Sequence, residues 1–219
     1  MGSSAQISAS KAFTLHLLCA LAFAVAWVVA CDVFSWTLVG HPALVLRLLF
    51  SVHAPFVIVV YSMLRREPEH CPFWKAVGRG LLAIPVGALL NAFGAIVLGA
   101  PVGISYLPKT IYWSLLMSLF TFVPAACVVG SSRTGWQSFL LANSRPIEEL
   151  DCMIILPAYG AIIGSWFGAW PMPLDWERPW QEWPICVTYG AVIGYLMGML
   201  VLTPAFILGM KRQARIKGD

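Results

Sequence analysis

The sequence predicts an all-α integral membrane protein, built as a bundle of six transmembrane helices. Of its 219 residues, 59% are apolar or aromatic and only 11% are charged, whereas roughly a quarter are charged in an ordinary soluble domain. The net charge is +4 and the basic residues are scattered, which argues against a nucleic-acid partner. Six stretches without Asp, Glu, Lys or Arg are long enough to cross a bilayer, a crossing that takes about 20 apolar residues.

These charge-free stretches define one multi-pass membrane domain. We expect its spans near residues 12–31, 44–64, 80–99, 111–130, 152–170 and 185–209. The second stretch reaches full length only if Arg47 lies inside the span, where its long side chain is expected to extend to the interface. The last five spans each contain a proline, which removes one backbone donor and bends a helix. Kinks are therefore predicted at Pro55, Pro85, Pro124, Pro157 and Pro204.

The distribution of basic residues predicts the orientation of the bundle. Six spans place both termini on one side, and cytosolic segments carry an excess of Lys and Arg. The only basic residues in the loops 32–43, 100–110 and 171–184 are Lys109 and Arg178. We therefore expect cytosolic termini and expect these three loops to face the lumen or exterior. The basic residues on the terminus side are Lys11, Arg65, Arg66, Lys75, Arg79, Arg133, Arg145, Lys211, Arg212, Arg215 and Lys217.

Glycines four residues apart mark one face of each of the last two spans. The sequence YGAIIG at residues 159–164 recurs as YGAVIG at residues 189–194. A helix face without side chains allows another backbone to approach closely. The pattern predicts a tight hairpin, with the spans packed on each other or on a partner's span. The two ladders consist of Gly160, Gly164 and Gly168, and of Gly190, Gly194 and Gly198.

The third span has a sparser stripe of small residues. It comprises Gly80, Ala83, Gly87 and Gly94, and Asn91 lies beside it. We expect the Asn91 amide to form a hydrogen bond between helices rather than to bind a ligand.

The loop between the last two spans carries most of the unusual chemistry. Trp176, Trp180 and Trp183 have the spacing of one face of a short helix, with Asp175 as its N-cap and Pro179 in its first turn. The other face would present Glu177, Arg178 and Glu182. One interpretation is an interfacial tryptophan belt; another is a partner or lipid contact, because Arg suits a lipid phosphate. The residues expected at such a contact are Pro173, Asp175, Trp176, Glu177, Arg178, Pro179, Trp180 and Trp183.

This loop also resembles a known family. The run from Gly168 to Pro184, with PLDWERPWQ at residues 173–181, is similar to the signature of the PIG-F family of glycosylphosphatidylinositol (GPI) anchor biosynthesis. The segments Gly99-Ala100-Pro101 and Thr121-Phe122-Val123-Pro124 agree with it. The first 90 residues match mainly in hydropathy.

The resemblance implies an accessory subunit rather than an enzyme. Members of the family associate with and stabilise the large GPI ethanolamine-phosphate transferases of the PIG-O and PIG-G type in the endoplasmic reticulum membrane. Those partners transfer phosphoethanolamine to mannoses of the GPI precursor and use zinc. The resemblance therefore implies no cofactor and no catalytic residue in this chain, and membrane lipids and a transferase as its partners.

The residues themselves favour the same interpretation. A two-metal site needs several Asp or His ligands around each ion. The three loops expected to face the lumen or exterior contain too few acidic and histidine residues for such a site. We expect no metal site, and expect His16, His53 and His70 to be hydrogen-bonded or solvated. The alternative function is a lipid transporter or scramblase with a polar route through Arg47, His53 and Asn91. It is disfavoured because the spans lack acidic residues and no inverted repeat is visible.

Overall fold

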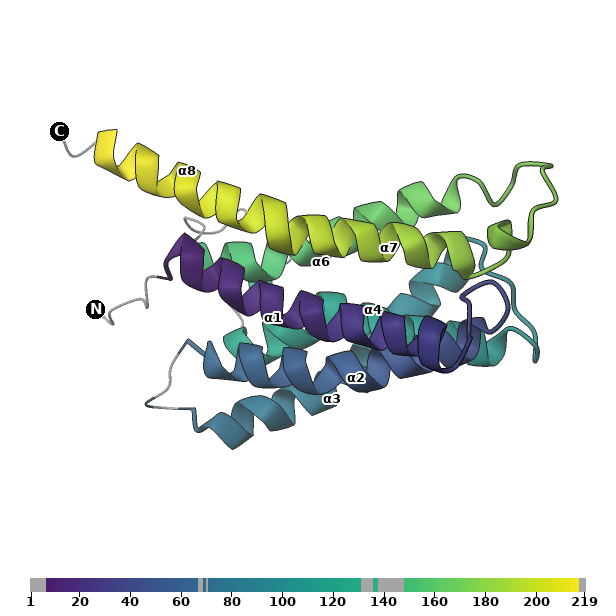
Figure 1. Ribbon diagram of the computed structural model, residues 1–219. Helices are drawn as coiled ribbons and strands as arrows, with labels where there is room; N and C mark the ends of the chain where they lie inside the picture. The colour runs from purple at the N-terminus through teal and green to yellow at the C-terminus, as the bar shows by residue number, and fades with distance from the viewer. Residues whose placement is uncertain (1–6, 67–68, 70, 131–135, 138–147, 217–219) are drawn as a thin grey trace.

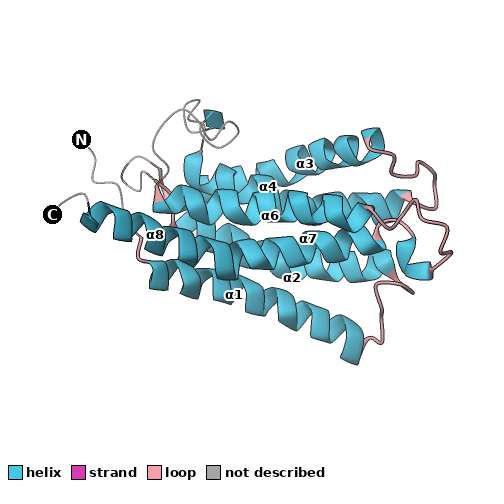
Figure 2. Cartoon of the chain, turned by 90° about the horizontal axis from the view of Figure 1, so that it is seen from above, coloured by secondary structure: helices cyan, strands magenta, loops and turns pink. Residues whose placement is uncertain are grey.

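The computed structural model describes residues 7–66, 69, 71–130, 136–137 and 148–216, and within these ranges the chain forms helices and loops and no strand (Figures 1 and 2). Six helical segments are long and apolar enough to cross a membrane. The predicted all-helical architecture with six long apolar helices is therefore confirmed. The helical elements are α1 (Ala9–Val28), η1 (Val29–Val33), α2 (Pro42–Met63), α3 (Phe73–Val97), α4 (Leu107–Val129), α6 (Glu149–Ala169), η2 (Pro179–Gln181), α7 (Ile185–Met197), η3 (Gly198–Leu202) and α8 (Thr203–Ile216).

The bundle has two distinct ends (Figure 1). One, called here the loop end, carries the connections 34–41, 98–106 and 170–184. The other, the terminus end, carries the start of α1 and the end of α8. Which end faces the cytosol stays a prediction. Of the basic residues that support it, Arg133, Arg145 and Lys217 lie outside the described residues.

Local chemistry explains where several helices begin. The Ser8 hydroxyl accepts the backbone N–H of Lys11 at 3.1 Å and caps α1. The Asp151 carboxylate accepts the backbone N–H of Glu148 at 3.1 Å at the start of α6, and α2 begins at Pro42. Caps of this kind satisfy donors that the first helical turn leaves free, and proline suits that turn because it has no N–H to satisfy.

Helix α4 forms the centre of the bundle. In the most apolar 18-residue stretch of α4, 78% of the residues are buried, whereas the corresponding share for α3 is 11%. Both α3 and α6 pack on α4, while α6 packs most extensively on α7. In Figure 2, α3 lies at one edge of the bundle. The outward surfaces of α3 and α6 are therefore left to lipid or to another protein.

Two helices extend beyond the expected spans. Helix α3 begins at Phe73 rather than near residue 80, and the last span continues through α8 to Ile216. The added turns contain Lys75 and Arg79 in α3 and a basic segment in α8. A helix continues into the interface although the apolar run has ended, so a search for charge-free stretches misses its polar turns.

A π-helical turn, η3, separates α7 from α8 and frees one carbonyl group. The backbone N–H of Thr203 donates to Gly198, and Pro204 has no N–H. The Met199 carbonyl is thus left without a donor from these two positions, and His16 Nδ1 donates to it at 3.0 Å. His16 Nε2 lies 3.0 Å from the Tyr61 hydroxyl, which donates to the Met153 carbonyl at 2.9 Å. His16 is therefore hydrogen-bonded, as expected, and ties α1 to α2, η3 and α6.

Candidate functional site

The two glycine ladders lie against each other between α6 and α7. A Cβ atom added to Gly160 would overlap the Gly194 carbonyl, and one added to Gly164 would overlap the Gly190 carbonyl. The reciprocal additions to Gly194 and Gly190 would overlap the carbonyls of Gly160 and Gly164. Only hydrogen fits at these positions, because the two backbones are in direct contact. Of the two arrangements that the sequence allowed, the ladders pack on each other.

The ladders are offset, so their outer members face other residues. A Cβ added to Gly168 would overlap the carbonyl of Cys186, and one added to Gly198 would lie 2.6 Å from the Leu156 carbonyl oxygen. All six ladder glycines thus contact backbone atoms of the neighbouring helix. This close contact fixes the separation of the two helix ends that hold the loop 170–184.

The predicted single helical face of three tryptophans is wrong. The loop contains only the three-residue 3₁₀ helix Pro179–Gln181, and Arg178 rather than Asp175 precedes it in an extended conformation. Proline disfavours a helical conformation in the residue before it, which is Arg178 here. Glu177 has a left-handed φ of 51°, which also ends any helix begun at Trp176. Trp176 and Trp180 are 57% and 37% exposed, whereas Trp183 is 5% exposed.

Gln181 holds the loop together and was not predicted from the sequence. Its side chain is buried; Nε2 donates to the carbonyls of Pro171 and Leu174, and Oε1 accepts the backbone N–H of Arg178 at 2.9 Å. One amide therefore joins both arms of the loop. The available signal was a lone glutamine in a segment rich in Pro and Trp, where backbone donors and acceptors lack regular partners.

Trp183 attaches the loop to the bundle. Its indole Nε1 donates to Thr110 Oγ1 at 3.0 Å, and its ring lies 5.0 Å from the ring of Trp113 between centroids. Both partners belong to α4, far away in sequence. At the rim, Lys109 Nζ lies 2.6 Å from Glu182 Oε1. The loop is therefore anchored to the central helix as well as to α6 and α7.

The remaining predicted loop residues divide into two groups. Pro173 lines a cavity described below, and Pro179 begins the 3₁₀ turn. The others form an exposed group, called here the loop surface, in which Trp176 and Trp180 make an edge contact at 6.1 Å between ring centroids. The loop surface consists of Asp175, Trp176, Glu177, Arg178 and Trp180.

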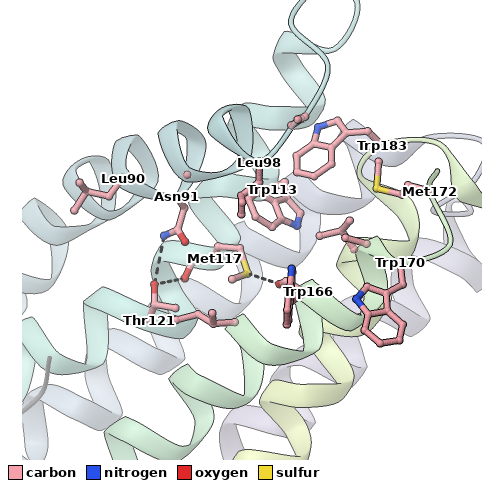
Figure 3. Close-up of a pocket in the computed structure, with 18 of the residues that line it drawn as sticks. Leu90, Asn91, Leu98, Trp113, Met117, Thr121, Trp166, Trp170, Met172 and Trp183 are labelled. Carbon is pink, nitrogen blue, oxygen red and sulfur yellow. Dashed lines mark hydrogen bonds between the residues drawn. The ribbon is translucent and has the colours of Figure 1, made fainter. Parts of the chain in front are cut away.

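Beneath the loop is a cavity of about 1130 Å³, which the sequence did not predict (Figure 3). Helices α3 and α6 line two of its sides and α4 lies between them. Met172, Pro173 and Trp183 belong to the loop and line the loop end of the cavity. Lining residues such as Leu98, 81% exposed, and Trp166, 61% exposed, open it toward the outside of the bundle. Its apolar lining with a few polar groups is typical of small-molecule sites between helices, and its volume lies just above their usual range of about 300–1,000 Å³.

The three segments that carry the family resemblance meet at this cavity. Gly99 and Ala100 come from the loop that follows α3, Thr121 and Phe122 from α4, and Trp170 from the run that begins at Gly168. They are far apart in sequence and lie on three sides of one space. The resemblance therefore maps to a single location in the fold, made of the cavity and the loop that covers it.

A few polar groups line the cavity. Asn91 Nδ2 donates to the Gly87 carbonyl at 2.8 Å and to Thr121 Oγ1 at 3.4 Å, so the expected hydrogen bond between helices is confirmed (Figure 3). Ser165 donates to the carbonyl of Ala161 at 2.8 Å. Trp113 is 6% exposed, and its Nε1 has no hydrogen-bond partner among the described residues.

The small-residue stripe of α3 explains why the space is open. A Cβ on Gly80 would lie 2.6 Å from Cys127 Sγ, and one on Gly87 would overlap Ser118 and come within 2.9 Å of Phe122. A Cβ on Gly94 would meet nothing within 4 Å. The first members of the stripe therefore contact α4, whereas Gly94 faces the cavity.

The polar residues proposed for a transport route are not gathered in one place. Arg47 is exposed on α2, and His53 is fully buried with its Nε2 3.3 Å from the Tyr195 hydroxyl. Asn91 alone among them lines the cavity. Within the described ranges, no three His, Cys, Asp or Glu side chains are grouped so that they could hold a metal ion.

These features define a class of protein: a polytopic helical membrane protein with a cavity between helices and an anchored loop above it. The chain belongs to the GPI biosynthesis protein family Pig-F, whose model matches residues 18–203. The matched region includes most of the first and all of the next four apolar helices, the loop surface and the cavity. No solved structure matches the chain.

Individual relatives match shorter regions. A human protein named GPI ethanolamine phosphate transferase, stabilizing subunit, is 38% identical over 122 residues, which are 55% of this chain and 54% of the relative. A Schizosaccharomyces pombe PIGF/3-ketodihydrosphingosine reductase fusion protein is 33% identical over 75% of this chain and 32% of its own length. Glycosylphosphatidylinositol anchor biosynthesis protein 11 of Pyricularia oryzae is 36% identical over 52% of this chain and 39% of its own length. The chain thus spans about a third to a half of the relatives it matches.

Proposed function

We propose that the chain is a non-catalytic accessory subunit that stabilises a GPI ethanolamine-phosphate transferase of the PIG-O or PIG-G type. The observation that carries this proposal is membership of the Pig-F family over residues 18–203, together with a relative named as the stabilizing subunit of that transferase. In this role the chain supports phosphoethanolamine addition to mannoses of the GPI precursor in the endoplasmic reticulum. The zinc-dependent chemistry belongs to the partner.

The orientation follows from the same proposal. The basic residues favour cytosolic termini, which would place the loop end in the lumen. The loop surface would then contact the partner or the lipid headgroups beside it. Its exposed tryptophans, one acidic pair and Arg178 suit a site that is part apolar and part polar.

The anchoring of the loop supports its role as a contact. Gln181 and Trp183 hold the loop from beneath, while Trp176 and Trp180 are exposed above them. A surface that is already ordered loses less conformational entropy when a partner binds. The ladder glycines contribute indirectly, because they fix the two helices that carry the loop.

The proposal is tested by removing the chain from cells and following the transferase. Steady-state transferase should fall severalfold and recover when the tagged wild-type chain is restored, with both proteins purified together in mild detergent. A loop-surface variant, Trp176→Ser with Arg178→Ala, should recover less transferase. Ile104→Ser is the matched control, because Ile104 is 92% exposed on the neighbouring loop. Unchanged transferase abundance without the chain would contradict the proposal.

A further inference from the structure

We infer that the cavity between α3, α4 and α6 binds one acyl chain of a glycerolipid, whose ester carbonyl accepts a hydrogen bond from Trp113 Nε1. This inference is independent of the proposed accessory function, because it concerns the chain alone. Its starting point is the Trp113 indole, which lines the cavity, is 6% exposed and has an N–H without a partner in the described part of the chain.

An unpaired buried donor calls for an acceptor. Buried tryptophans usually find a hydrogen-bond partner for the indole N–H, and leaving such a donor unpaired costs about 1–3 kcal/mol. Trp183, the neighbouring tryptophan, follows this rule by donating to Thr110 at 3.0 Å. Figure 3 shows Trp113 among the residues that line the cavity. An acceptor supplied by a ligand would complete the site.

The depth of Trp113 selects an ester rather than a phosphate. Lys109 is held at the rim by Glu182 at 2.6 Å and marks the polar end of α4. Trp113 follows it by one helical turn, about 6 Å deeper at ~1.5 Å per residue. Ester carbonyls lie beneath the phosphates of a glycerolipid, next to the first methylene groups. The hydrocarbon chain would then run on past Met117 toward Thr121, about 12 Å further.

The wall of the cavity favours a flexible chain over a helix from a partner. The loop residues Met172 and Pro173 line its loop end, so a continuous transmembrane helix would meet the loop there. An apolar transmembrane helix also satisfies its own carbonyls and offers few acceptors for Trp113. A lipid has both an acceptor and a narrow apolar chain, and it reaches the cavity from the side, where Leu98 and Trp166 are exposed.

Gly94 provides a way to fill the cavity without disturbing the fold. A Cβ there meets nothing within 4 Å, and Gly94 is part of the cavity lining. Gly78 of the same helix also has open space around its Cβ position but does not line the cavity. Gly94→Leu is therefore the blocking variant, and Gly78→Leu is its matched control. Trp113→Phe keeps an aromatic ring and removes the N–H together with part of the indole ring; the diether probe described below separates the loss of the N–H from the loss of ring volume.

The test uses the purified full chain in nanodiscs that contain phosphatidylcholine with a photoactivatable diazirine in one acyl chain. Crosslinks should map to residues 90–100, 113–122 and 158–170, which line the cavity. Gly94→Leu should lower labelling there about tenfold, and Trp113→Phe about fivefold, the effect of one hydrogen bond. Gly78→Leu should leave labelling within about twofold of wild type, the scatter expected of a surface change.

A diether phosphatidylcholine probe distinguishes the acceptor. Because it has no ester carbonyl, it should label the wild-type chain about fivefold less, and Trp113→Phe should have no further effect. Equal labelling of the wild type and Gly94→Leu by the diester probe would overturn the inference. So would a Trp113→Phe loss that is the same for both probes. Trp113→Phe provides an independent test if Gly94→Leu fails to fold.

Discussion

Gly164 of α6 and Gly190 of α7 face each other so closely that a Cβ on either residue would overlap the carbonyl oxygen of the other. Gly164 is also within reach of the next turn, since its added Cβ would lie 3.2 Å from Gly194 Cα. The loop 170–184 joins the two helices one turn beyond these contacts. The position of the loop therefore depends on a contact between two backbones.

Replacing Gly164 with Leu should separate the two helices. The side chain has no free volume, because backbone rather than a flexible side chain occupies the space. We expect a loss of about 1–3 kcal/mol or more in the free energy of unfolding and a lower yield of monodisperse protein in detergent. Gly209→Leu is the control, since a Cβ there meets nothing within 4 Å.

The same variant should lower the amount of transferase complex without altering its turnover per assembled complex. This expectation rests on the accessory role, in which the chain contributes stability rather than chemistry. Complex yield and activity per complex are measured on the same purified sample. Gly194→Leu should behave alike, and normal assembly of both variants would refute the structural role of the ladder.

Gln181→Leu should loosen the loop while leaving the helices intact. The substitution leaves the carbonyls of Pro171 and Leu174 and the N–H of Arg178 without their side-chain partner, at a cost of about 1–3 kcal/mol. Hydrogen exchange by mass spectrometry should increase in residues 171–182 only. Glu182→Gln is the control, because it changes an exposed ion pair worth at most about 1 kcal/mol. Equal exchange in both variants would argue against Gln181 as the anchor.

Trp183 and Thr110 should be energetically coupled. Trp183→Phe and Thr110→Val each remove the same hydrogen bond of 3.0 Å. The double variant should therefore lose less stability than the sum of the losses of the two single variants. A double-mutant cycle of unfolding in detergent should give a coupling of about 1 kcal/mol. Strict additivity would mean that the contact contributes nothing to stability.

Arg178→Ala should weaken recovery of the partner or of bound lipid severalfold without changing the unfolding temperature. Arg178 is exposed on the loop surface, and its backbone N–H still bonds Gln181. Quantitative mass spectrometry of the purified complex measures transferase and lipid together. Wild-type amounts of both transferase and lipid would show that Arg178 does not contribute to the contact.

Features set by the bilayer and by close backbone contact could be predicted from the sequence. Charge-free runs locate the spans because hydrocarbon excludes charged side chains. Glycines at four-residue spacing predict the hairpin because only hydrogen permits the approach of Gly160 to Gly194. The charge-free runs and the glycine spacing are both local patterns, because each lies within one or two consecutive segments of the sequence.

The loop and the cavity could not be predicted in the same way. The tryptophan spacing suggested one helical face, but Pro179 prevents the helix and Trp183 packs instead on Trp113 of α4. The anchor Gln181 belongs to no motif. The cavity exists because α3 and α6 both pack on α4 and leave space beside Gly94. Such a space depends on the relative positions of three helices, which no local pattern encodes.

In the proposed accessory role, the chain acts by stabilising a transferase. The most direct test is to deplete the chain rapidly in cells and measure the half-life of the transferase by pulse labelling. If the chain stabilises the transferase, the transferase half-life should shorten severalfold and should be restored by the wild-type chain. A transferase of unchanged half-life, with the purified chain alone transferring phosphoethanolamine to a GPI precursor, would contradict it.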